Sequence, residues 1–127
     1  MSKPISSLMK HQVWSVDIDD TVDAVEQFLA LKRLSLVPVR DSDGPVVGVI
    51  SAADLLRFHA EKKDPSTVRA WQLCTFKPIE VSVGTSISEV ARLMVERQIH
   101  HVLVMESGAI KGIVSSLDFV QTFVSES

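Results

Sequence analysis

Two serine–aspartate pairs are the side chains in this chain best suited to hold a ligand. Ser51 and Asp54 stand three residues apart, and Ser115 and Asp118 repeat the pair 64 positions later. Each pair completes the pattern Gly-x-x-Ser-x-x-Asp, where a β-forming run gives way to a helical pattern. Free backbone N–H groups at a helix start suit a phosphate, and a carboxylate suits the paired hydroxyls of a ribose, which are donors. The pairs could therefore hold a phosphorylated sugar.

The same residues also have a purely structural interpretation. A serine at the start of a helix accepts a backbone N–H bond, and an acid three residues later opposes the helix dipole. Such a cap stabilises a helix by about 1 kcal/mol in any protein. The two interpretations are compatible, because a serine can cap a helix and still face a ligand.

The repeated pair belongs to an internal duplication that covers most of the chain. Apolar positions recur at a constant offset of 65 residues: Leu8 with Leu73, Val16 with Val81, Val25 with Val90, Val37 with Val102, and Val39 with Val104. One residue is then lost in a turn, where residues 41–44 correspond to residues 106–108, and the offset becomes 64. Register is therefore kept where packing requires it and relaxed in a loop.

Composition and charge exclude several classes of protein. The 127 residues include 13 basic and 16 acidic side chains with dispersed signs and a net charge of −3, which gives no electrostatic footprint for nucleic acid. No apolar run approaches the roughly 20 residues that cross a bilayer, and the start lacks the apolar stretch of a secretion signal. Cys74 is the single cysteine, which fits a reducing compartment. We expect a cytoplasmic protein without membrane or nucleic-acid partners.

Each repeat is predicted to fold as strand, helix, strand, strand, helix, so the fold class is α/β (α+β). The predicted strands are residues 13–18, 36–39 and 46–50 in the first repeat, and 79–83, 101–105 and 110–114 in the second. The predicted helices begin at Asp20 or Thr21 and at about Ala52 in the first repeat, and at Ser86 and about Ser116 in the second.

The expected boundaries follow from the duplication and from a charged, proline-containing stretch between its halves. Repeat one should span residues 1–62, the linker residues 63–69, and repeat two residues 70–127. A repeat of about sixty residues buries so little surface that it would be only marginally stable alone, so we expect the two repeats to form one compact module.

Taken together, these patterns resemble a tandem pair of cystathionine-β-synthase (CBS) repeats, also called a Bateman module. The resemblance rests on a short leading helix at residues 5–9 echoed at 70–74, on the Val37-Pro38-Val39 strand, and on the duplicated Gly-x-x-Ser-x-x-Asp pattern. It implies two β-α-β-β-α repeats related by pseudo-two-fold symmetry, which bind an adenosine-type ligand in a cleft between them. It also implies a homodimer, no catalytic activity, and a separate effector protein that responds to the ligand.

The resemblance assigns roles to residues in both repeats. The aspartate of the pattern, Asp54 or Asp118, would hold the ribose, and Ser51 or Ser115 would lie near ribose or phosphate. The adenine slot would be lined by Val16, Val37, Pro38, Ile79, Val102 and Ile113. The alternative for each of these six is ordinary core packing. Ala53 and Leu117 replace the second hydroxyl that some strong nucleotide sites of the family carry before the aspartate, which predicts modest affinity.

Two adjacent histidines, His100 and His101, are the best candidates to meet a phosphate. They precede the second strand of repeat two, where repeat one has Ser35 and Leu36. If His101 meets the phosphate, its protonation should favour binding, because a histidine of ordinary pKa, about 6.5, gains charge between pH 7 and 6, so a nucleotide phosphate should bind more tightly at pH 6 than at pH 8. The alternative is that one histidine is exposed and the other packed. Adjacent histidines rarely chelate one ion, so no metal is expected.

The remaining possibilities differ in what the module binds. AMP, ADP or ATP are the expected ligands, with NAD and S-adenosylmethionine as secondary candidates and no obligatory cofactor. No Gly-x-Ser-x-Gly elbow, P-loop or Cys–His pair suggests an enzyme. The competing hypothesis is a ligand-free dimerisation or docking module, whose apolar surface would come from helix residues Leu55, Leu56, Phe58, Phe119, Val120 and Phe123.

Overall fold

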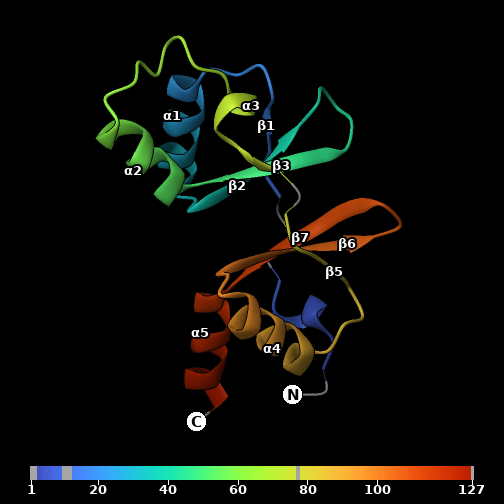
Figure 1. Cartoon of the computed structure of the whole chain (residues 1–127). Helices are drawn as coiled ribbons and strands as arrows, with labels where there is room; N and C mark the ends of the chain where they lie inside the picture. Colours follow the sequence, from blue (N-terminus) through green and yellow to red (C-terminus); the bar gives the residue numbers. More distant parts are fainter. Residues whose placement is uncertain (1–2, 10–12, 77, 127) are drawn as a thin grey trace. The chain divides into compact units, whose positions relative to one another are not determined.

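The computed structural model describes residues 3–9, 13–76 and 78–126, and divides the chain into two compact units. The repeat-one unit is Trp14–Pro78. The repeat-two unit combines Ile79–Ser127 with the N-terminal segment Met1–Val13. Both units are mixed α/β, as the sequence predicts, and each has its own small mixed sheet (Figure 1).

The repeat-one unit contains a four-stranded sheet in the order β1-β2-β3-β4. Its elements are β1 (Val16–Asp17), α1 (Val22–Lys32), β2 (Leu36–Arg40), β3 (Val46–Ser51), α2 (Ala52–Ala60), α3 (Ala70–Leu73) and β4 (Thr75–Phe76). Strands β1 and β2 are parallel and are joined through α1, whereas β2 and β3 form an antiparallel hairpin. Strand β4 pairs antiparallel with β3.

The core of this unit lies between the two long helices and one face of the sheet. Helix α1 contributes Val22, Val25 and Leu29, and α2 contributes Leu55 and Phe58. They pack with alternate residues of β2 and β3, because side chains of a strand point to opposite faces in turn. In Figure 1, α1 and α2 lie together beside β2.

The repeat-two unit has a three-stranded sheet in the order β5-β6-β7. Its elements are the 3-10 helix η1 (Ile5–Ser7), β5 (Glu80–Ser82), α4 (Ile87–Arg97), β6 (His101–Glu106), β7 (Ala109–Ser115) and α5 (Ser116–Glu126). Strand β5 is parallel to β6, and β6 is antiparallel to β7, which repeats the arrangement of β1, β2 and β3. The core includes Val90 and Met94 from α4, Phe119 from α5, and Ile5 from η1.

Each leading segment packs against the helix start of the other repeat. In the repeat-two unit, Ile5 donates its N–H to the carbonyl of Thr85 at 2.7 Å. In the repeat-one unit, the equivalent Ala70 donates to the carbonyl of Asp20 at 2.8 Å. Isolated bridges repeat the arrangement, pairing Pro4 with Ser86 and Thr21 with Arg69. The compact units therefore differ from the halves of the duplication, whose boundaries at 1–62, 63–69 and 70–127 stay a prediction.

The observed elements follow the predicted ones, with differences at their ends. The order strand, helix, strand, strand, helix is confirmed in both repeats. Strand β1 is shorter than the predicted 13–18, and β5 is shorter than the predicted 79–83. Strand β4 was not predicted, because two exposed residues carry no alternating pattern.

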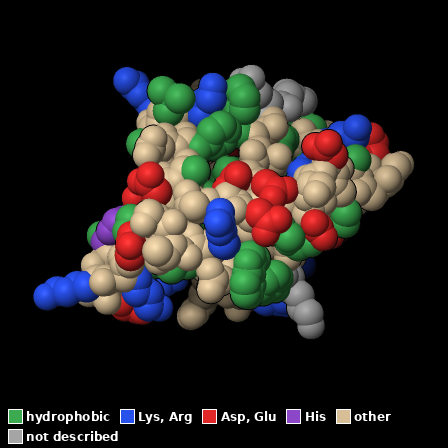
Figure 2. Space-filling model, turned by 90° about the horizontal axis from the view of Figure 1, so that it is seen from above, with side chains coloured by type: hydrophobic (Ala, Val, Ile, Leu, Met, Phe, Trp, Pro, Cys, Tyr) green, Lys and Arg blue, Asp and Glu red, His purple; other side chains and the backbone are tan. Residues whose placement is uncertain are grey.

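Charges of both signs lie on the face of the molecule seen in Figure 2. Figure 2 shows acidic and basic side chains interspersed with hydrophobic ones on one face. Among the described residues, no helix combines the length and apolar character that a bilayer crossing requires.

Candidate ligand site

The start of α2 is held by a reciprocal set of hydrogen bonds between Ser51 and Asp54. The Ser51 hydroxyl accepts the Asp54 backbone N–H at 3.2 Å, and the Asp54 Oδ2 accepts the Ser51 backbone N–H at 2.8 Å. The Ser51 hydroxyl also donates to the same Oδ2 at 3.0 Å. Asp54 is buried, and this capping box confirms the structural interpretation of the first pair.

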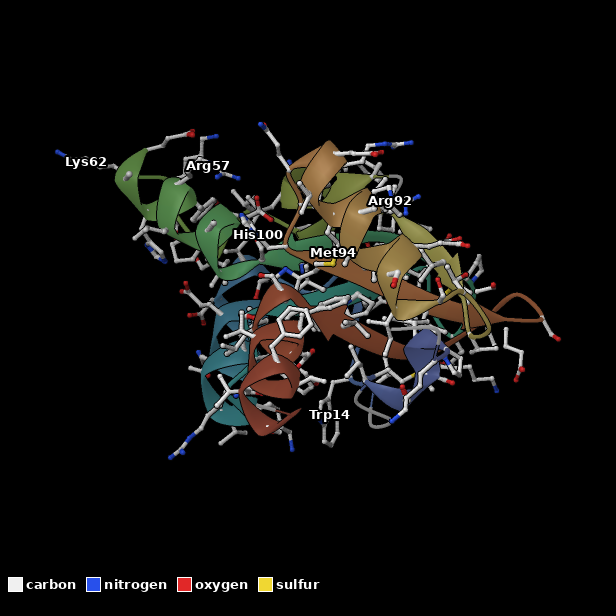
Figure 3. The ribbon with its side chains drawn as sticks, turned by 90° about the horizontal axis from the view of Figure 1, so that it is seen from below. Trp14, Arg57, Lys62, Arg92, Met94 and His100 are labelled. Atoms are coloured by element: carbon white, nitrogen blue, oxygen red, sulfur yellow. The ribbon has the colours of Figure 1, made fainter. Side chains whose placement is uncertain are left out.

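The other oxygen of Asp54 is taken by an arginine one helical turn further along. Arg57 forms an ion pair through Nη2 with the Asp54 Oδ1. The carboxylate side chain is only 10% exposed, whereas the arginine side chain is 66% exposed and projects from α2 (Figure 3). Both oxygens of Asp54 are therefore occupied by groups of the protein itself.

The start of α5 repeats the cap with fewer bonds. The Asp118 Oδ2 accepts the Ser115 backbone N–H at 2.8 Å, and the Ser115 hydroxyl accepts the Asp118 backbone N–H at 3.3 Å. The residue equivalent to Arg57 is Gln121, because the offset here is 64. Within residues 3–9, 13–76 and 78–126, no lysine or arginine forms an ion pair with Asp118, which is half-buried.

The two histidines lie beside this second cap. The His100 carbonyl accepts the backbone N–H of Ser116, the first residue of α5, at 2.9 Å. His101 lies directly opposite Ser115 in the β6–β7 ladder. His100 is exposed at the turn before β6 (Figure 3). His101 is half-buried. The repeat-two unit thus brings together four of the predicted site residues.

The equivalent bond in the repeat-one unit comes from a residue without a cationic side chain. The Ser35 carbonyl accepts the Ala52 backbone N–H at 2.8 Å. The backbone around the two caps is therefore the same, but the residues that flank it differ.

Comparison with known proteins gives the family. The CBS domain matches residues 5–61 and 70–125. This chain belongs to the CBS-domain family. The domain matches twice, so the chain carries a CBS pair.

Solved structures with this fold cover almost all of the CBS pair. An uncharacterized conserved protein from Pyrococcus horikoshii is 27% identical, with a TM-score of 0.88, over 97% of this chain and 93% of that one. CBSX2, solved in complex with AMP, is 24% identical, with a TM-score of 0.83, over 98% of both chains.

A curated relative places a similar CBS pair in a longer protein. The arabinose 5-phosphate isomerase KpsF of Escherichia coli is 26% identical over 115 residues, which are 90% of this chain but 35% of the isomerase. Three further curated relatives are also spanned over less than half of their length. The similarity to the isomerase is therefore partial.

The predicted adenine-lining residues of the CBS pair divide into two groups. Val16, Val37 and Val102 pack within the hydrophobic cores of their own units, which is the packing role weighed from the sequence. Pro38 is fully buried on β2, opposite Val49 of β3.

Ile79 and Ile113, in the repeat-two unit, are half-buried. Ile113 lies opposite Leu103 in the β6–β7 ladder, and the Ile79 carbonyl accepts the Leu103 N–H at 3.0 Å. A contact of any of the six with adenine stays a prediction.

Three of the six residues expected to form an apolar docking surface are core residues. Leu55, Phe58 and Phe119 are buried, so the expectation that they offer surface is wrong. The helical period of 3.6 residues turns them toward the sheet. The other three, Leu56, Val120 and Phe123, are exposed by 74%, 52% and 47%.

Metal and thiol chemistry have no support at the candidate site. Within the part of the chain that the structure describes, no group of three or more His, Cys, Asp or Glu side chains could hold a metal ion. Cys74 is buried near the start of β4, and this burial raises the pKa of its thiol, with a further contribution from the charge of Asp54. A neutral, buried thiol is a poor nucleophile.

Sequence reasoning missed Arg57 as part of the site. The signal was available, because residues three apart on a helix face each other and Asp54–Arg57 has that spacing with opposite charges. It also missed that the His100 main chain itself supports the α5 start.

Proposed function

We propose that this CBS pair is a non-catalytic regulatory module that binds an adenosine-type ligand at the α5 start and signals its occupancy to a separate protein. The observation that carries the proposal is the arrangement of Asp118, Ser115 and His100 around one helix start. AMP, ADP and ATP are the first candidates. AMP bound to CBSX2, a protein of the same fold, supports this ligand class.

Ribose recognition would fall to the Asp118 carboxylate. A carboxylate has about four acceptor positions, and the Ser115 N–H uses one of them on Oδ2. Two ribose hydroxyls need two acceptors, which Asp118 can supply without losing its cap bond. Hydrogen bonds from hydroxyls to a carboxylate are charge-assisted and roughly twice as strong as neutral ones.

Phosphate recognition would fall to the histidines, since an aspartate repels a phosphate. His100 is exposed, and its carbonyl accepts the Ser116 N–H, which places this residue beside the α5 start. The deciding comparison is the affinity of AMP for the wild type against that for His100→Ser, which installs the residue of the other repeat. Equal affinities would remove His100 from phosphate recognition.

The direct test is a thermal-shift screen with AMP, ADP, ATP, NAD and S-adenosylmethionine. A ligand selective for the folded state stabilises it by about 2.7 kcal/mol at a hundredfold excess over Kd. Asp118→Asn should remove the shift, because it keeps an oxygen for the Ser115 N–H but loses the charge. Asp54→Asn is the matched control and should keep the shift. No shift with any ligand at millimolar concentration would contradict the proposal.

An apolar stripe on α5 supports a second candidate function, homodimerisation or partner docking without a ligand. Leu117, Val120 and Val124 are 60%, 52% and 69% exposed, at helical spacings that place them on one face with Phe123. Exposed apolar patches of this kind mark interaction surfaces. Sedimentation should then show a dimer, and Val120→Glu should give a monomer whose response to AMP is unchanged. A wild-type protein that sediments as a monomer even at about millimolar concentration would contradict homodimerisation.

A further inference from the structure

The two copies of the Ser-x-x-Asp cap differ most in what occupies the carboxylate. At Asp54, Oδ2 accepts two hydrogen bonds from Ser51, and Oδ1 is paired with Arg57. Of about four acceptor positions, three are filled. At Asp118, Oδ2 accepts the Ser115 N–H, and no described lysine or arginine forms an ion pair with the carboxylate.

The ion pair between Asp54 and Arg57 is held by its position within one helix. Arg57 reaches back one turn along the same helix, so its side chain needs no rearrangement of the fold to stay bound. The carboxylate is only 10% exposed, which reduces the screening that weakens surface pairs. A ribose arriving at Asp54 would have to displace the guanidinium from a charge-assisted bond to make its own.

We propose that Arg57 is a specificity-determining residue that closes the first copy of the site by occupying Asp54, so that the chain binds one ribose-containing ligand, at Asp118. This inference rests on the proposed function and adds the number of ligands that one chain binds and the residue that sets this number. The corresponding residue in the open copy is Gln121, which is neutral. Exchanging the residues at these two positions should therefore exchange the behaviour of the copies.

Two variants exchange these residues between the copies. Arg57→Gln gives the first copy the residue of the second and should open it. Gln121→Arg gives the second copy the residue of the first and should weaken binding there about tenfold, as expected when a ligand loses access to a charge-assisted hydrogen bond. Both changes lie on helices and introduce good helix formers, so folding should be kept.

A charge-matched control is provided by the chain itself. Arg33 is the exposed C-cap of α1, and its equivalent in the other repeat is Gln98, which adopts the same left-handed conformation. Arg33→Gln removes the same charge as Arg57→Gln and likewise installs the residue of the other repeat. It should leave the stoichiometry at one.

The experiment is an amide NMR titration, which reports each copy separately in a chain of 127 residues. Adenosine is used beside AMP, because it has no phosphate and so removes the difference between His100 and Ser35. In the wild type, amides of residues 115–121 should shift and those of residues 51–57 should not. In Arg57→Gln both sets should shift, and in Gln121→Arg the shift of residues 115–121 at the wild-type midpoint concentration should fall to about a fifth of its wild-type size.

The outcomes distinguish this inference from the proposed function. No shift in any protein overturns the proposed function and the inference with it. Shifts confined to residues 115–121 in both wild type and Arg57→Gln overturn the inference alone. Shifts in both sets in the wild type also overturn it alone, because Arg57 would then not close the first copy.

Discussion

The C-cap of helix α1 is Arg33 with φ of 56°, and the C-cap of helix α4 is the equivalent Gln98 with φ of 54°. The register of β2 and β3 shifts after Val39, and that of β6 and β7 shifts after the equivalent Val104. The two CBS repeats thus share two backbone details, a left-handed helix C-cap at a residue other than glycine and a register shift in the hairpin. Around the caps, by contrast, Arg57 in one repeat corresponds to Gln121 in the other. A common backbone therefore does not fix what each copy can bind.

The leading segments give a second comparison. Ile5 in the repeat-two unit and Ala70 in the repeat-one unit are equivalent, and both are completely buried. The larger side chain belongs to the unit with the three-stranded sheet. The repeat-one unit has α3 and strand β4 in its four-stranded sheet. The residues equivalent to β4, 10 and 11, lie outside the described residues.

The largest expected effect is that of Ile5→Ala, which gives the first leading segment the residue that the second has at the equivalent position, Ala70. Removing a fully buried isoleucine should lower the free energy of unfolding by about 2–5 kcal/mol. Hydrogen exchange should show the loss of protection in α4, β6 and β7, because Ile5 packs in that core. Ile5→Val is the control and should cost about 1 kcal/mol. Loss of protection confined to α1, β2 and β3 would contradict the packing of Ile5 in the core of the repeat-two unit.

The next effect concerns Gly48, where β3 and β4 approach closely. A Cβ at Gly48 would lie 2.6 Å from the Thr75 carbonyl oxygen and 3.0 Å from the Cys74 Sγ. Gly48→Ala should therefore cost about 1–3 kcal/mol in urea unfolding. Gly84→Ala is the matched control, since nothing lies within 4 Å of a Cβ there, and it should change stability by less than about 0.5 kcal/mol. Equal effects would show that the β3–β4 contact is not tight.

A smaller difference is expected between the two serine caps. Ser51→Ala loses a hydroxyl that both accepts and donates, whereas Ser115→Ala loses a hydroxyl that accepts from Asp118. Each should destabilise the protein by about 1 kcal/mol in thermal or urea unfolding, with the larger loss at Ser51. Threonine at either position is the control, because it keeps the capping oxygen. A larger loss at Ser115 would reverse the comparison.

The smallest effect is a pH dependence from Cys74, whose counterpart in the other repeat is Met9. Burial raises the pKa of the thiol in the folded protein above its ordinary value of 9.0. The unfolded chain therefore loses the proton first, and the stability contributed by the neutral thiol is complete below pH 9 and falls as pH rises above it. Stability measured from pH 8 to 10.5 should decline more in the wild type than in Cys74→Ala. An equal decline in stability with pH in the two proteins would show that the Cys74 thiol does not cause it.

Much of this architecture could be predicted from the sequence, because its signals are local. Thr21, Ser51 and Ser86 cap α1, α2 and α4, and their residue types alone predict helix starts there. The alternating apolar strands and the offset of the duplication predict the order of elements within each repeat. The capping role of the two Ser-x-x-Asp pairs follows in the same way.

The rest depends on partners that a local pattern does not name. The sequence of residues 5–9 indicates a short helix, but nothing in it says that Ile5 joins the core of the other repeat. Burial of Leu55 and Phe58 is set by the phase of α2 against the sheet, which an apolar list does not show. The pairing of Asp54 with Arg57, by contrast, follows a local spacing and could have been predicted from the helix that begins at about Ala52.

The central claim is that the open carboxylate of Asp118 takes the ribose. A crystal structure of the protein grown with AMP tests it most directly. The account predicts ribose hydroxyl oxygens within about 3 Å of the Asp118 carboxylate, with Asp54 still bound to Arg57. AMP held by Asp54, or Asp118 bonded only to Ser115 at saturating AMP, would contradict it.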